Sequence, residues 1–308
     1  AYGSTLKKDL TGSVSAVDVN QIDKIAVMSV DQALQGRVAG VQMSSGDGQP
    51  GSEMNVVIRG ANSLTQDNSP LYVVDGFPME DFQISSISPQ DIESISVLKD
   101  ASSTSLYGSR GANGVIIIQT KQGKKGMPSI KYVGSVSMQK TTRHMEMMDP
   151  YDYVVYQIER NPLNFNRYLT DTGMTLDDYK TKEEVDWQNQ LFRLAPMHTH
   201  NLSIYGGTDK TKYNISGNFA DQQGVVINSG HRKGGGRISF TQDIGKRMKF
   251  TINAAYHADK ISGLIASESL SSSNSFATYL MYRTWGSRPF YISDDASIDD
   301  LFDEDSGT

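Results

Sequence analysis

The chain of 308 residues has no cysteine, no long apolar run and no excess of basic residues. Without cysteine it has neither disulfides nor thiolate metal ligands. Its mean hydropathy of −0.42, together with the lack of any apolar run near the ~18 residues of a membrane helix, excludes an α-helical membrane protein. The net charge of −6 argues against a nucleic-acid partner, because phosphate binding needs a clustered basic face.

Signatures of enzyme chemistry are also missing. No Gly-x-Ser-x-Gly nucleophile elbow occurs, and no Gly-Lys-Ser/Thr follows the glycine-rich turn at residues 108–114. His198 and His200 point to the same face of a predicted strand, but no third metal ligand is evident near them. The sequence therefore predicts a protein that is not an enzyme and that needs no resident metal or cofactor.

An acidic segment at the carboxyl end leaves one exception open. Its carboxylates are numerous enough for Ca²⁺, although they lack the glycine-punctuated order of an EF-hand. The alternative is a solvated loop. The residues are Asp294, Asp295, Asp299, Asp300, Asp303, Glu304 and Asp305.

The first part of the chain predicts a small α+β domain over residues 1–126. Residues 91–120 read as strand, short helix, glycine turn and strand, with a plausible further helix at residues 30–38. Gly108, Gly111 and Gly114 punctuate the turn, and at least one of Gly111 and Gly114 is expected to have positive φ.

Beyond residue 126 the pattern predicts membrane β-strands. Apolar and polar residues alternate over residues 130–138, 213–219 and 248–258, and more weakly over 198–206 and 237–244. These runs are close to the ~9–11 residues of a tilted membrane strand, with Ile252 expected toward lipid and Asn253 toward the lumen. A soluble β-sandwich would alternate too, but the predicted long connections fall on one side, as in outer-membrane barrels.

Four motifs stand in one order: LQGRVAGVQ at residues 34–42, IRGANS at 58–63, PLYVVDGFP at 70–78 and LKDASSTSLYGSRGANGV at 98–115. Together they resemble the plug domain of TonB-dependent outer-membrane transporters, in the SusC/RagA branch of Bacteroidetes. The resemblance implies a barrel of about 22 strands holding an N-terminal α+β plug in its lumen. Residues 1–126 would be this plug, and residues 127–308 the first strands and extracellular loops of an incomplete barrel.

The resemblance implies active import across the bacterial outer membrane, with the plug on the periplasmic side of the lumen. The expected partners are a TonB protein, which would bind an N-terminal segment largely absent here, and a SusD-like surface lipoprotein acting as a lid. The expected cargo is an oligosaccharide or a peptide, and the barrel would contact outer-membrane lipid. Two other functions stay open: a soluble β-rich carbohydrate-binding or adhesin module, and a TonB-linked signalling receptor.

Residues that could contact cargo lie in two predicted plug loops, residues 61–69 and 76–82, and beside them. Amides and carboxylates would bond sugar hydroxyls and aromatic rings would stack on a pyranose; the alternative is that these residues form turns or pack inside the plug. The candidates are Asn62, Asn68, Asp75, Phe77, Asp81 and Phe82.

Other residues are expected to have structural roles. Arg59 and Arg110, each beside a glycine, are expected to pair with carboxylates where the plug meets the barrel wall. The plug residues with predicted structural roles are Arg59, Gly60, Gly108, Arg110, Gly111 and Gly114. The tyrosines predicted to form interfacial girdles are Tyr132, Tyr205, Tyr213 and Tyr256.

Overall fold

The computed structural model of the chain forms two compact units. The first comprises residues 1–139, 195–224 and 229–263, and the second residues 140–194, 225–228 and 264–308. The acidic segment proposed for Ca²⁺ lies outside the described residues. The described residues are 14–17, 28–45, 48–52, 54–60, 68–79, 82–100, 104–245, 247–263 and 284–291.

A mixed five-stranded sheet forms the centre of the first 120 residues, with the order β1-β6-β7-β4-β5. β4 and β7 are parallel, and the other neighbours are antiparallel. The predicted strands over residues 92–98 and from residue 115 onward are confirmed as β6 and β7. The strands are β1 (Val14–Val17), β4 (Leu71–Val74), β5 (Phe77–Met79), β6 (Ile92–Leu98) and β7 (Val115–Thr120).

Short helices and a hairpin cover this sheet. The main core joins α2 and β3 to the central strands and includes Val30, Leu34, Ile92, Ile95 and Ile116, each at most 1 % exposed. The helix predicted over residues 30–38 is shorter than expected, because Gly36 takes φ +71° and ends it. The elements are α2 (Val30–Leu34), β2 (Val41–Ser45), β3 (Met54–Ile58), and the 3₁₀ turns η2 (Ile84–Ser86), η3 (Pro89–Asp91) and η4 (Ser105–Gly111).

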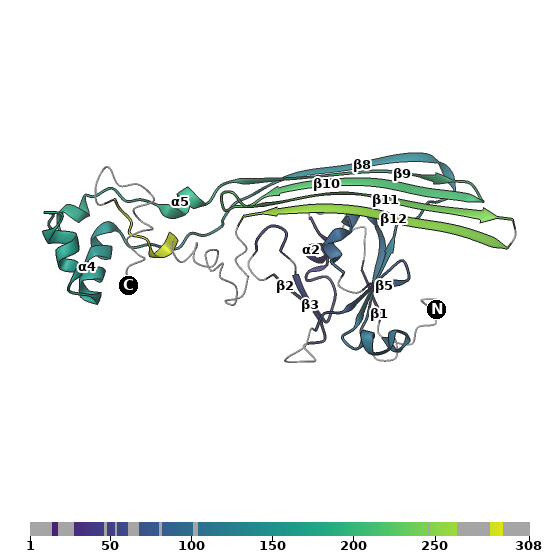
Figure 1. Cartoon of the computed structure of the whole chain (residues 1–308), viewed down its shortest axis with the longest axis horizontal. Helices are drawn as coiled ribbons and strands as arrows, with labels where there is room; N and C mark the ends of the chain where they lie inside the picture. The colour runs from purple at the N-terminus through teal and green to yellow at the C-terminus, as the bar shows by residue number, and fades with distance from the viewer. Residues whose placement is uncertain are drawn as a thin grey trace. The chain divides into compact units, whose positions relative to one another are not determined.

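Five long antiparallel strands, called the wall here, follow in chain order and lie side by side (Figure 1). All five predicted strands are confirmed, and each is 13 to 15 residues long, which is enough to cross a bilayer at a tilt. The strands are β8 (Gly126–Gln139), β9 (Ala195–Gly207), β10 (Thr211–Gln223), β11 (Gly230–Ile244) and β12 (Met248–Ser262).

Strands β10 and β11 extend well beyond the alternating runs predicted over residues 213–219 and 237–244. β10 continues to Gln223 and β11 begins at Gly230. Three consecutive glycines, residues 234–236, hide the alternation and have low strand propensity. They are nevertheless strand residues, because β10 and β12 pair with them on both sides.

The two faces of the wall differ in chemistry. Residues directly opposite one another on neighbouring strands share a face, so the register aligns Ile130, Ile204, Ile215 and Ile238 in one row. Three members of this row are at least 45 % exposed. The opposite face carries buried polar residues, among them Asn201, Asn214, Ser216, Arg237 and Ser239.

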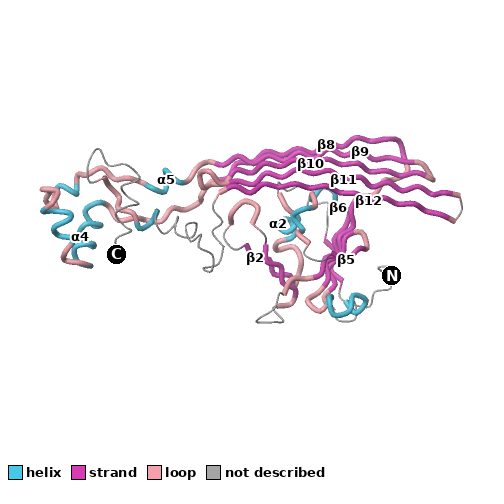
Figure 2. Tube along the Cα trace, viewed as in Figure 1, coloured by secondary structure: helices cyan, strands magenta, loops and turns pink. Residues whose placement is uncertain are grey.

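The second unit contains helices that the sequence pattern did not predict (Figure 2). Asp149 caps α4 by accepting a hydrogen bond from the Asp152 N–H, and Asp186 caps α5 through the Asn189 N–H. Its core consists of Val154, Tyr168, Tyr179 and Phe290. The elements are α4 (Pro150–Arg160), the π-helical turn η5 (Asn166–Thr170), η6 (Asp178–Lys180) and α5 (Trp187–Leu191).

None of the helices within the described ranges is both long and apolar enough to cross a membrane.

Candidate functional site

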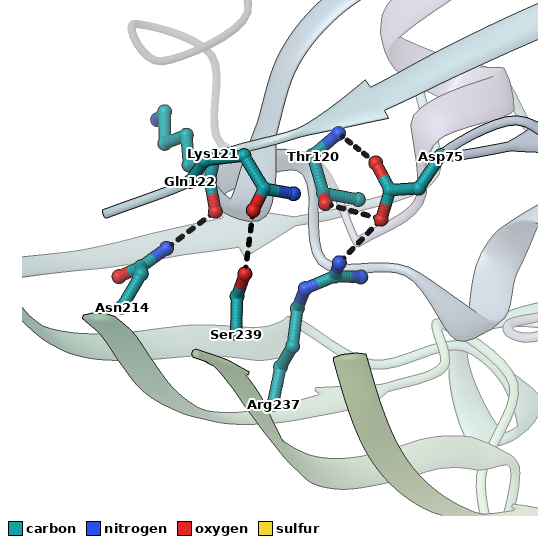
Figure 3. Close-up of polar contacts among 7 residues, drawn as sticks. All are labelled: Asp75, Thr120, Lys121, Gln122, Asn214, Arg237 and Ser239. Atoms are coloured by element: carbon teal, nitrogen blue, oxygen red, sulfur yellow. Dashed lines mark hydrogen bonds and ion pairs between the residues drawn. The ribbon is translucent and has the colours of Figure 1, made fainter. Parts of the chain in front are cut away.

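Asp75 is the polar centre of the contact between the mixed sheet and the wall. It lies in the β4–β5 turn with φ +50°. Its Oδ1 accepts the Thr120 N–H at 2.9 Å, and its Oδ2 accepts the Thr120 hydroxyl at 2.7 Å. Oδ2 also pairs with the Arg237 guanidinium at 2.5 Å (Figure 3). The Asp75 and Arg237 side chains are only 12 % and 9 % exposed. One buried carboxylate thus joins the hairpin, the end of β7 and β11.

Other hydrogen bonds extend this contact along the wall, two of which are also drawn in Figure 3. Each contributes roughly 0.5–1.5 kcal/mol net, since water would otherwise satisfy the same groups. Polar contacts of modest individual strength thus continue along the wall, beside a small apolar cluster of Met28, Met197 and Ala220. The hydrogen bonds run from Asn214 to the Lys121 carbonyl (2.7 Å), from Ser239 to Gln122 (2.6 Å), from Lys233 to the Ser85 carbonyl (3.1 Å) and from Asn201 to Ser88 (3.4 Å).

Asp91 adds a second buried carboxyl group near the same guanidinium. Burial raises its pKa above the usual value, while Ser216 and the positive charges of Arg237 and Lys121 act in the opposite direction. The Asp91 backbone carbonyl accepts the Lys121 N–H at 2.7 Å. Arg237 contacts the Asp75 carboxylate directly, at 2.5 Å, and so Asp75 is its ion-pair partner.

A cavity of about 370 Å³ lies between the β4–β5 hairpin and the wall. It brings together three of the cargo candidates, Asp75, Phe77 and Phe82, and the wall contributes Asn218 and Asn253. Aromatic rings beside amide groups are the chemistry expected for a polyhydroxylated ligand or a peptide. The cavity therefore contains aromatic and amide groups that could bind such a ligand. Both carboxylate oxygens of Asp75, however, already bind protein partners.

The cargo candidates differ in their surroundings. Phe77 is 67 % exposed, whereas Phe82 packs against the Tyr72 ring at a centroid distance of 5.7 Å. Asn68 is half-buried. Asn62 and Asp81 lie outside the described residues. Contact of these side chains with cargo stays a prediction.

Arg59 pairs with a carboxylate, as predicted, but its partner is not a residue of the wall. Arg59 forms an ion pair with Asp100, so both partners belong to the first 126 residues. The two residues are adjacent in space because β3 ends at Ile58 and β6 ends at Leu98. Arg110 is exposed and lines a second cavity, of about 710 Å³, together with Tyr72 and Phe82.

Of the two glycines expected to include one with positive φ, Gly114 has it and Gly111 does not. Gly114 has φ +94°, and a Cβ built there would lie 2.7 Å from Ile58 Cδ1. Gly111 has no positive φ, but a Cβ there would lie 2.9 Å from the Thr104 carbonyl oxygen. Gly60 and Gly108 also have positive φ. Positive φ or close packing accounts for each of these glycines.

Three of the four predicted girdle tyrosines lie on the apolar face of the wall. Tyr132 and Tyr256 are 62 % and 74 % exposed, and Tyr213 pairs in register with Phe240. Tyr205 is a correction: it pairs with Asn214, whose side chain bonds the Lys121 carbonyl, and so lies on the opposite face. The sequence error arose because Tyr205 precedes two glycines that break the alternation.

Sequence reasoning missed the wall side of the contact. Arg237 and Lys233 are the charged wall residues that bond the β4–β5 turn and the η2 turn. A signal was present, since His231, Lys233, Arg237 and Ser239 occupy odd-numbered positions on one face of one strand. The run of glycines concealed it.

Comparison with known proteins gives a consistent picture. Residues 6–115 match the family model of the TonB-dependent receptor plug domain. The TonB-dependent receptor SusC of Bacteroides thetaiotaomicron is 38 % identical over 267 residues, covering 83 % of this chain and 25 % of SusC. The TonB-dependent receptor P3 of Formosa agariphila is 38 % identical over 253 residues, covering 82 % of this chain and 24 % of that protein. This chain thus spans about a quarter of the length of these relatives.

Solved structures of TonB-dependent transporters show a similar fold. The RagAB peptide importer in its open-open state aligns with a TM-score of 0.75 and 29 % identity, over 85 % of this chain and 32 % of the matched chain. The ferric citrate transporter FecA aligns with a TM-score of 0.55 and 16 % identity, over 82 % of this chain and 32 % of that one, which supports the fold alone. These relatives are receptors and transporters rather than enzymes.

The two kinds of match cover different parts of the chain. The family model covers the mixed sheet up to the start of β7, and the relatives extend the similarity over most of the rest. Proteins of this family are outer-membrane β-barrels. The chain belongs to the SusC-like branch of the TonB-dependent receptors and comprises the plug region and the first strands of the barrel.

Proposed function

We propose that the protein of which this chain is part imports a nutrient across the bacterial outer membrane. The observation that carries the proposal is the seating of the plug sheet against the polar face of the wall through Asp75 and Arg237. A wall that is apolar outside and polar toward a plug suits a closed, water-filled passage in a bilayer. Opening such a passage requires the plug contacts to be broken and remade.

We further propose residues 1–126 as the plug, located on the periplasmic side of the lumen. The connections between β9 and β10 and between β11 and β12 are tight turns, the connection between β10 and β11 spans residues 224–229, and the connection over residues 140–194 is long. Short periplasmic turns and longer outer loops are usual in outer-membrane barrels. By strand parity, the second unit then belongs to the outer surface.

The proposed partners follow from the relatives. A TonB protein would supply work through an N-terminal segment, and a SusD-like lipoprotein would cover the outer mouth. The resemblance to the SusC/RagA branch implies an oligosaccharide or a peptide cargo, and the RagAB peptide importer supports a peptide. The cavity beside Asp75 suits either, because Phe77 and Asn218 offer both a ring and an amide.

Uptake in the native bacterium tests the proposal. Cells with the gene deleted, complemented or combined with a tonB deletion are given fluorescent oligosaccharides and peptides. We expect uptake that needs both this protein and TonB, with the protein in the detergent-extracted membrane fraction. Recovery in the soluble fraction would favour the adhesin or carbohydrate-binding alternative. Cargo-dependent transcription without uptake would favour a signalling receptor.

A further inference from the structure

The second unit contains a cavity of about 440 Å³ that the plug and wall do not share. This volume falls within the ~300–1,000 Å³ of small-molecule sites. One side is a face of α4, with Tyr153, Tyr156 and Arg160 spaced three to four residues apart. Trp187 and Trp285, the chain's two tryptophans, also line it.

Hydrogen bonds within the unit fix the walls of this cavity. Trp187 Nε1 donates to the Arg288 carbonyl at 2.8 Å, and Tyr291 packs edge-on against the Trp187 ring at a centroid distance of 5.7 Å. Gln188 bonds both the N–H and the carbonyl of Met145, at 2.9 and 2.8 Å. The cavity is therefore preformed, so a ligand would not have to order it.

The lining combines aromatic rings with carboxylates. Glu146 and Glu184 are exposed residues at the cavity, and Arg160 is the cationic side chain there apart from the titratable His144. Aromatic rings can stack on the C–H face of a sugar while carboxylates and amides accept its hydroxyls. An anionic ligand would meet unfavourable charge, and a purely apolar side chain would desolvate the carboxylates without replacing their hydrogen bonds.

We propose that this cavity is a recognition site for a neutral oligosaccharide, distinct from the plug. The inference rests on the proposed import function and narrows its cargo to uncharged glycans. Ordering a loop of this length costs roughly 1–2 kcal/mol per residue in backbone entropy, and the unit offsets that cost with its own aromatic core around Tyr179 and Phe290. All residues that line the site belong to the second unit.

Binding to the purified full-length protein in detergent tests the proposal. The probe is an array of defined neutral oligosaccharides, uronic-acid oligosaccharides and short peptides, followed by calorimetry on the best neutral binder. We expect Tyr156→Ala and Glu184→Gln each to weaken binding about five- to tenfold. Glu183→Gln, an exposed neighbour that does not line the cavity, should leave affinity unchanged.

Several results would overturn the site. These are no array binding by the unmodified protein, preference for peptides or acidic glycans, or equal affinity in both cavity variants and the control. Far-ultraviolet circular dichroism and surface abundance check that the variants fold. Normal glycan binding with no TonB-dependent uptake would instead refute the import function while leaving the binding site in place.

Discussion

Replacing Arg237 should loosen the plug far more than replacing an exposed arginine of the same strand. In Arg237→Gln the Asp75 carboxylate stays buried, at 12 % exposure, without its cation. At a charge separation near ~4 Å and an effective dielectric constant of ~20, the lost attraction is about 4 kcal/mol. Removing one partner of a buried pair costs roughly 3–5 kcal/mol, and the two remaining Thr120 contacts place the expected loss toward the lower end.

Hydrogen exchange followed by mass spectrometry measures this loss at the site itself. The Thr120 N–H donates to Asp75, so peptides covering residues 115–126 should exchange about 10²-fold faster in Arg237→Gln, since each ~1.4 kcal/mol is a factor of ten. Arg232→Gln is the matched control. It removes an ion pair with Asp221 in which the arginine is 66 % exposed, and such pairs contribute about 0–1 kcal/mol.

A double-mutant cycle with Asp75→Asn separates pairing from general damage. If the two groups interact as described, the double variant loses less than the sum of the single losses, by roughly 0.5–3 kcal/mol. Additive losses, or equal exchange in the Arg237 and Arg232 variants at equal surface abundance, would refute the reasoning.

Three more predictions concern the plug and the wall. Ile252→Arg should reduce inserted barrel, because arginine on the lipid face costs roughly 2–4 kcal/mol, whereas Asn253→Arg should be tolerated; equal surface abundance of the two would contradict the face assignment. Gly114→Val should lower the plug's thermal midpoint, because its φ of +94° and the 2.7 Å approach to Ile58 both exclude a side chain; an unchanged midpoint would show that the turn relaxes. Asp91→Asn should stabilise the plug at pH 8. Because the pKa of Asp91 is raised in the folded state, its contribution to stability is fullest below the unfolded pKa and is lost as pH rises through the folded pKa. The hydrogen-exchange rates of plug peptides should therefore depend less on pH in the variant, after correction for intrinsic exchange.

The elements that the sequence predicts well are those with local patterns. β6 and β7 are short apolar runs bounded by turns, and the wall strands alternate with period two. The helix predicted over residues 30–38 is longer than α2, because the apolar spacing continues past Gly36, where the helix ends. Local pattern thus gave element type correctly and boundaries less well.

What the sequence could not give depends on contacts between distant segments. Asp75 stood out as a polar turn residue, but its bond to Arg237 joins positions 162 residues apart. The helices of the second unit are short and are stabilised by packing around Phe290, far along the chain. The residues around α4 in the sequence give no sign that it packs against Phe290.

The link between the plug sheet and the wall is short, which limits how far the two can separate. β7, the central strand of the plug sheet, ends at Thr120, and β8 begins at Gly126. Even fully extended, residues 121–125 reach only about 17 Å. The carboxyl end of β7 is therefore closely tethered to β8, while β1 lies at the edge of the sheet and, among the described strands, pairs with β6. A pulling force on the amino end of the sheet would therefore act first on the β1–β6 pairing, whereas the five-residue link limits how far the carboxyl end of β7 can separate from β8.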